Sequence, residues 1–163
     1  MLQKLMALIH FLPSELVIAL LAAMPIVELR AAIPVGVGVY HMSSVSAYGW
    51  SVLGNLIPLV LLFLYLPRLI SALSFYSPKI HGIFERYFFR LSKKHAEALN
   101  RYGSLFLLVF VGIPHPGGGV WTASLLAILF RLHPKFAIPA IAGGVLISGL
   151  VVLFLTEASI KLF

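Results

Sequence analysis

Two opposite charges lie close together within a long apolar stretch of the sequence. Glu28 and Arg30 are the only charged residues between Leu16 and Tyr40. One charge at the centre of a bilayer costs about 2.5–3.5 kcal/mol, so pairing, water or a function must offset this pair. Side chains two positions apart diverge on an ideal helix, so they either flank an unwound turn or serve separate partners. Glu28 is a candidate proton acceptor and Arg30 a candidate anion ligand; a buried structural ion pair is the alternative.

A second candidate site is a turn rich in proline and glycine. Residues 113–122 read IPHPGGGVWT, and the glycines precede an apolar helical run. Successive glycine N–H groups at a helix N-terminus can bind an anion, although glycines also allow close helix packing. His115 can titrate near neutrality or act as a hydrogen-bonded structural residue. The other candidate ligand contacts in this stretch are Gly117, Gly118, Gly119, Trp121 and Thr122.

Asn55 is a polar side chain within an apolar segment, close to the helix-breaking Pro58. It either lines a cavity or bonds to a neighbouring helix. Metal and catalytic signatures are missing from the sequence: the six histidines are scattered, aspartate is absent, and neither H-E-x-x-H nor G-x-S-x-G occurs. We therefore expect no metal, no cofactor and no enzymatic activity.

The composition is that of a membrane protein. Hydrophobic residues make up 61% of the chain and charged residues 10%, whereas soluble domains have about 25% charged residues. Three charge-free stretches, at 31–67, 102–130 and 136–156, each exceed the roughly 20 residues that cross a bilayer as helix. A soluble enzyme, a disordered chain and, without cysteine, a disulfide scaffold are excluded. For residues 1–15 we expect an interfacial helix in place of a signal peptide.

Most charges gather in one segment of the chain. Seven basic and two acidic residues lie between Arg68 and Arg101. Ser77 and Pro78 predict a helix start and Gly103 a helix end, with apolar residues at three- and four-residue steps between them. This pattern is typical of an amphipathic helix on a membrane, its cationic face toward anionic headgroups. The net charge of +7 thus indicates membrane orientation, and we expect no nucleic-acid partner.

The sequence contains a weak internal repeat. A shift of 89 residues aligns Pro25 with Pro114, together with several small and apolar positions. Each copy holds an apolar segment broken by proline, a short polar link and a second apolar run. We therefore predict two repeats, at 14–67 and 103–156.

The charges of the two polar links predict the topology. The link at 41–46 has no lysine or arginine, whereas the link at 131–135 has Arg131 and Lys135. By the positive-inside rule the second link joins the basic connector in the cytoplasm while the first stays outside. This requires an even number of crossings between the connector and the second link, which a re-entrant hairpin provides. The residues expected to break the two hairpins are Pro25, Pro34, Gly36 and Gly38, and Pro114, Pro116 and Gly117–Gly119.

Together these features predict an all-α integral membrane protein with an inverted repeat. Each half is expected to be a re-entrant helical hairpin plus a transmembrane helix, and a cytoplasmic amphipathic helix at 68–102 joins the halves. Broken helices at membrane depth must line protein or a wet cavity. We expect one multi-pass domain, 1–163, in the cell membrane with both termini outside. A homodimer is also expected, because two spans are few for a sealed pathway.

Three blocks of sequence resemble a known family. PIVELRAAIPVG at 25–36, the pair Gly54–Asn55, and IPHPGGGVWT at 113–122 are similar to the bacterial and archaeal small multidrug export proteins. That family is similar in turn to the DedA superfamily, for which inverted repeats with re-entrant hairpins and the movement of lipid carriers such as undecaprenyl phosphate have been proposed. DedA hairpins tend to carry more acidic and arginine residues, whereas here the second hairpin has no charge before Arg131. The resemblance therefore does not imply the whole DedA proton route.

The pattern and the resemblance imply a transporter or flippase for an amphiphilic, anionic, lipid-phosphate-like substrate. Arg30 and the glycine amides would hold the headgroup between the two hairpins, Glu28 would carry the coupling proton, and membrane lipid would surround the protein. One alternative is export of lipophilic cationic drugs through Glu28, against which the charge of Arg30 argues. Another is a non-transporting scaffold whose basic helix recruits lipid or a partner, which leaves the buried charges unexplained.

Overall fold

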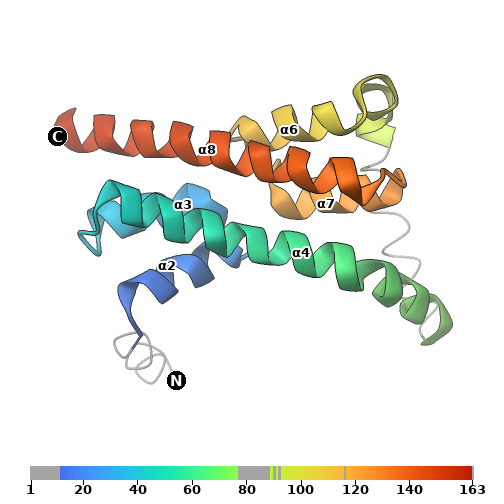
Figure 1. Ribbon diagram of the computed structural model, residues 1–163, viewed down its shortest axis with the longest axis horizontal. Helices are drawn as coiled ribbons and strands as arrows, with labels where there is room; N and C mark the ends of the chain where they lie inside the picture. Colours follow the sequence, from blue (N-terminus) through green and yellow to red (C-terminus); the bar gives the residue numbers. More distant parts are fainter. Residues whose placement is uncertain (1–11, 77–88, 90, 92, 116, 163) are drawn as a thin grey trace. The chain divides into compact units, whose positions relative to one another are not determined.

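The computed structural model describes residues 12–76, 89, 91, 93–115 and 117–162, in which every regular element is an α-helix (Figure 1). In chain order the helices are α2 (Ser14–Ala23), α3 (Glu28–Gly38), α4 (Ser44–Tyr76), α6 (Ser104–Gly112), α7 (Val120–Leu129) and α8 (Pro134–Leu162). Residues 1–11 of the expected interfacial helix, and the helix start expected at Ser77 and Pro78, lie outside the described residues. The all-α prediction is confirmed for the part described.

Two helices are long and apolar enough to cross a bilayer. They are Ser44–Arg68 within α4 and Pro134–Leu162 of α8, each longer than the roughly 20 residues that the hydrocarbon core requires. Both helices expose rows of large apolar side chains of the kind that mark a membrane surface. These include Ile57, Leu61 and Leu64 on α4 and Ile147, Leu150 and Phe154 on α8. The chain thus has two candidate membrane spans, in agreement with an integral membrane protein.

α4 is longer than the sequence pattern indicates. The first repeat is predicted to end at 67, but the helix continues to Tyr76 and contains Pro67 in its interior. The Arg68 guanidinium donates a hydrogen bond to the Leu64 carbonyl at 2.8 Å, so this charge lies along the helix without ending it. Neither proline nor glycine occurs between Arg68 and Pro78, and Pro78 disfavours helix in the residue before it.

The described part of the basic connector is helical and amphipathic, as predicted. Residues 93–102 form helix, and Gly103, at φ 55°, ends it. Leu99 is buried, whereas Lys93 and Arg101 are exposed. A left-handed conformation after the last turn is a common helix end, and glycine adopts it without a Cβ penalty.

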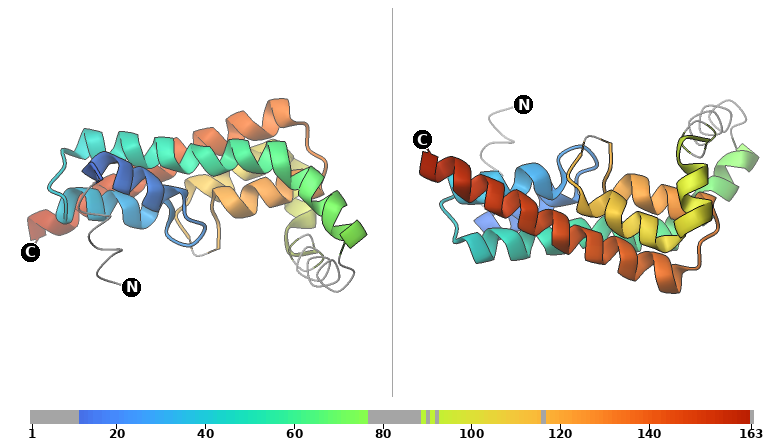
Figure 2. Two further views of the ribbon diagram at one scale, coloured as in Figure 1. Left: turned by 90° about the horizontal axis from the view of Figure 1, so that it is seen from below. Right: turned by 90° about the horizontal axis from the view of Figure 1, so that it is seen from above.

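The remaining helices are too short to cross a membrane alone. α2, α3, α6 and α7 have 9 to 11 residues each, or about 14–17 Å of length, against a hydrocarbon core of about 30 Å. α2 packs against α3, and α6 against α7. The short helices therefore form two helical hairpins, the first of which is visible from two directions in Figure 2.

The breaks within the hairpins agree only partly with expectation. The second hairpin breaks between Gly112 and Val120, as predicted, but the first breaks only at 24–27, around Pro25. Pro34, Gly36 and Gly38 all lie inside α3, so their predicted role as helix breaks is wrong. Gly36 serves packing instead, because a Cβ atom there would lie 2.9 Å from the Cβ of Ala47 on α4.

The helices divide into two compact units. One unit comprises Met1–Ile57 with Leu146–Phe163, and the other comprises Pro58–Val145. The first holds the α2–α3 hairpin with the beginning of α4 and the end of α8. The second holds the α6–α7 hairpin with the remaining parts of the two long helices. Each unit thus contains one hairpin, and each is described below by itself.

Close backbone approach at glycines holds the first unit together. At Gly54 of α4 a Cβ atom would lie 2.7 Å from the Cα of Ala19 on α2. At Gly149 of α8 a Cβ atom would lie 2.8 Å from the Cε2 atom of Tyr48 on α4. Small residues at such crossings let membrane helices gain van der Waals contact that larger side chains would prevent.

Candidate functional site

Glu28 occupies a strained position where the first hairpin turns. α2 ends at Ala23, and Glu28 is the first residue of α3 with a positive φ of 49°. A residue other than glycine adopts this left-handed conformation at a cost of about 1–2 kcal/mol. The side chain is nevertheless buried, with Glu28 6% exposed. The combination of burial, a carboxylate and a left-handed backbone makes Glu28 a candidate functional position.

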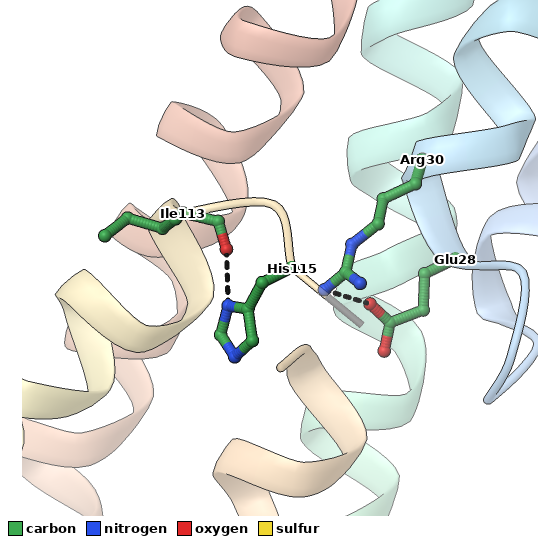
Figure 3. A network of polar contacts seen from close by, with 4 residues as sticks. All are labelled: Glu28, Arg30, Ile113 and His115. Atoms are coloured by element: carbon green, nitrogen blue, oxygen red, sulfur yellow. Dashed lines mark hydrogen bonds and ion pairs between the residues drawn. The ribbon is translucent and has the colours of Figure 1, made fainter. Parts of the chain in front are cut away.

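Arg30 lies close to the Glu28 carboxylate. Its Nη2 atom is 3.9 Å from Oε2 of Glu28 (Figure 3). At that distance the two groups make an electrostatic contact. A direct hydrogen bond would place the nitrogen and the oxygen about 2.7–3.2 Å apart. On a regular helix the two side chains would diverge, and the left-handed turn at Glu28 provides the departure from helical geometry that lets them meet. The structure therefore places the two side chains in contact at the start of α3.

Asn55 is buried in the same unit. It lies on α4 and is 1% exposed, and its Oδ1 atom has no hydrogen-bond partner in the described part of the protein. Ser51, one helical turn earlier, is fully buried, and its hydroxyl oxygen is equally unpartnered among the described residues. The sequence analysis missed Ser51, although its spacing of four from Asn55 places both on one helix face.

The turn of the second hairpin is built around His115. The Gly118 N–H donates to the His115 carbonyl at 3.2 Å, and Gly117 has φ 81°. A type II turn requires such a positive φ at its third residue, which explains glycine at 117. The Nδ1 atom of His115 is 2.9 Å from the Ile113 carbonyl (Figure 3). His115 is thus held by its own turn; Pro116 lies outside the described residues.

The glycines provide fewer amides for an anion than expected. The amide of Gly118 is used within the turn, so the expected run of three available N–H groups is wrong at this position. Gly118 must also lack a side chain, because a Cβ there would collide with the His115 ring. α7 begins at Val120 with Gly119 before it, and no described side chain caps that end. An anion site here would therefore use the amides from Gly119 onward.

A histidine from the connector also belongs to this turn. The ring of His95 lies 5.2 Å from Phe110, and Phe110 lies 4.9 Å from His115, both edge to face. Burial lowers the pKa of His95, and the neighbouring Lys94 and His115 lower it further. Burial and the nearby positive charge therefore favour the neutral form of the His95 ring. The sequence analysis missed it, although its spacing of four residues from Leu91 and Leu99 places it on the apolar face of the connector helix.

The candidate residues therefore fall into two groups. Glu28, Arg30 and Asn55 belong to the first unit, where Glu28 and Arg30 form the ion pair described above. The second unit contains His115, Gly117, Gly118, Gly119, Trp121 and Thr122, the last two half-buried in the first turn of α7.

Comparison with known proteins places most of the chain in one family. The family model described as "Putative small multi-drug export protein" matches residues 28–151. The match begins at Glu28 and extends into α8, so it includes the candidate residues at the turns of both hairpins. No curated protein and no solved structure matches the chain.

Proposed function

The chain belongs to the small multidrug export family, and from this premise we propose that it is a membrane transporter for an amphiphilic, anionic substrate, coupled to a proton. The observation that carries the proposal is the buried Glu28 carboxylate with Arg30 at 3.9 Å, within a chain that is 61% hydrophobic. Ionisable groups at such depth commonly serve proton relays and substrate sites.

Charge balance links the proton to the substrate. While Glu28 is ionised, it neutralises Arg30, and an anion has little reason to bind. When Glu28 takes up a proton, its charge no longer offsets that of Arg30, and an anionic headgroup can take the place of the carboxylate. The site has no net charge either when Glu28 is ionised or when Glu28 is protonated and an anion is bound. Protonation alone or anion binding alone would leave one charge in hydrocarbon. Proton and anion therefore bind together, while the substrate's apolar tail stays in the lipid.

The same proposal includes two re-entrant hairpins in an inverted repeat. Four short helices in two hairpins, with two long apolar helices, support it, because a hairpin of helices only about 15 Å long enters and leaves by one face. The uncharged link at 41–46 and the basic link at 131–135 support an outside first link and a cytoplasmic second link. Both chain ends then lie outside.

Single-cysteine labelling tests this topology, and the absence of cysteine makes it clean. Ser43→Cys and His133→Cys both place a thiol at an exposed link position. In intact cells a membrane-impermeant maleimide is expected to label position 43 only, and position 133 only after permeabilisation. If both positions label in intact cells, the hairpins are ordinary crossings and the re-entrant topology is wrong.

Transport itself is tested with the purified protein in phosphatidylcholine vesicles containing a trace of fluorescent phosphatidic acid. We expect the protein to speed exchange of this lipid between leaflets, as measured by bleaching of the outer leaflet. A pH difference of one unit, worth about 1.4 kcal/mol, is expected to drive net movement, whereas a membrane potential alone is not, because the bound state carries no net charge. Exchange equal to that of protein-free vesicles would contradict the proposal.

Export of lipophilic cations through Glu28 is the second candidate function. The family description favours it, and a buried carboxylate is a suitable acceptor for a cation. The guanidinium 3.9 Å away repels such a substrate, which is why we rank anion transport first. A lipophilic phosphonium cation in the same vesicles separates the two: movement of the cation and not of the lipid phosphate would favour the exporter.

A further inference from the structure

Two neighbouring polar side chains are buried inside the first unit, and each has an oxygen atom to which no described residue hydrogen-bonds. Ser51 is 0% and Asn55 1% exposed, and neither Ser51 Oγ nor Asn55 Oδ1 meets a hydrogen-bond partner in the part of the chain described. Folded proteins leave few buried polar atoms unsatisfied, because losing water without a replacement is costly. Two such atoms one turn apart on a single helix therefore require a common explanation.

The packing of α4 shows where these two side chains point. Gly54 meets Ala19 of the hairpin, and Val52 meets Gly149 of α8, where a Cβ would lie 3.6 Å from Val52 Cγ2. At about 100° per residue, both polar residues fall on the helix between these two contacting faces. They point into the angle where the hairpin and α8 converge on α4, away from lipid.

The chemistry of the two groups selects their partner. An amide oxygen only accepts hydrogen bonds, and a hydroxyl both donates and accepts. Their shared partner must therefore donate a hydrogen bond to Asn55, and it can either donate a hydrogen bond to Ser51 or accept one from it. A water molecule does both and adds no charge, whereas a bare cation would add one to an interior whose ion pair is already balanced. Side chains four residues apart on a helix lie about 5–6 Å apart at Cβ, a span that one water bridges.

We propose that Ser51 and Asn55 hold a buried water molecule within the first unit. The adjacent side of α4 contacts both helices of the hairpin that carries Glu28, through Ala19 and Gly36. This water therefore places a polar, exchangeable group against that hairpin. Resting on the proposed function, we assign it a role in delivering the proton to Glu28.

Radiolytic labelling tests the water site, because X-rays split a bound water into hydroxyl radicals that oxidise a thiol beside it. Ser51→Cys and Asn55→Cys are compared with Val52→Cys, a buried neighbour on the same helix that faces Gly149. In the full chain in phosphatidylcholine vesicles, hydroxyl radicals formed from bound water by X-ray radiolysis are expected to oxidise the thiols at positions 51 and 55 at least about tenfold faster than the thiol at position 52. Equal rates at all three positions would overturn the proposal.

Two further measurements separate the other outcomes. The labelling is repeated in sodium salt and in choline salt. If sodium alone protects position 51, the site binds a cation and the proposed water is wrong. The variant Ser51→Ala with Asn55→Leu, which keeps the hairpin residues, is then run in the lipid-exchange assay. Slower pH-driven exchange is expected; unchanged exchange, together with fast labelling, would overturn only the role in proton delivery. The labelling rates do not depend on transport, so they test the water site even if the proposed transport function is wrong.

Discussion

Replacing Arg30 with alanine is expected to lower the exchange of fluorescent phosphatidic acid by about 100-fold or more. The change removes the group proposed to neutralise the headgroup, and it leaves the buried Glu28 carboxylate without its counter-ion at 3.9 Å. Removing one partner of a hydrogen-bonded charge pair between two binding partners typically costs about 2–5 kcal/mol of binding free energy, and each 1.4 kcal/mol is tenfold in affinity. Initial exchange rates in vesicles, normalised to the amount of folded protein, measure the effect.

Companion variants identify which property of Arg30 matters. Arg30→Lys keeps the charge and is expected to retain part of the activity, whereas Glu28→Gln imitates the protonated acid and is expected to retain anion movement while losing its dependence on pH. The control is Arg68→Ala, which removes an exposed arginine whose guanidinium bonds to the Leu64 carbonyl. Retained or faster movement of a lipophilic cation in Arg30→Ala would instead support the cation exporter.

Replacing Gly54 with alanine is expected to disrupt the first unit. The added Cβ would lie 2.7 Å from both the Cα and the carbonyl carbon of Ala19, and backbone atoms cannot move aside as the end of a flexible side chain can. Overpacking of this kind costs about 1–3 kcal/mol or more, which for a chain of this size lowers Tm by roughly 5–10 °C. Thermal unfolding in detergent, followed by tryptophan fluorescence, checks the prediction.

Gly49→Ala is the matched control for this substitution. Gly49 lies on the same helix five residues earlier, and a Cβ atom there would meet nothing within 4 Å. Alanine is about 1 kcal/mol better than glycine inside a helix, so this variant is expected to be as stable as the parent or slightly more stable. If both variants unfold at the same temperature, α2 and α4 do not touch at Gly54.

The membrane character and the main candidate residues could be predicted from the sequence because they depend on composition and local pattern. Long charge-free stretches predict the two apolar helices whatever their neighbours. The run of proline and glycine at 113–119 has no helical alternative, so that break was also predictable. Pro34 and Gly36 misled the same reasoning, because a helix packed on both sides tolerates residues that would weaken an isolated one.

Three features can be predicted from the amino-acid sequence alone: two apolar helices long enough for a bilayer, a basic amphipathic connector, and one acid and one arginine in an apolar stretch. These features depend on the free-energy cost of placing charges and backbone polar groups in hydrocarbon. That cost is set by each residue and its neighbours in sequence. Three features arise only when the helices pack: Glu28 adopts a left-handed turn and meets Arg30, Ser51 joins Asn55 in the interior, and the His95 ring packs edge to face against Phe110. Those outcomes depend on which helix faces approach one another, and side chains distant in sequence determine that approach through packing.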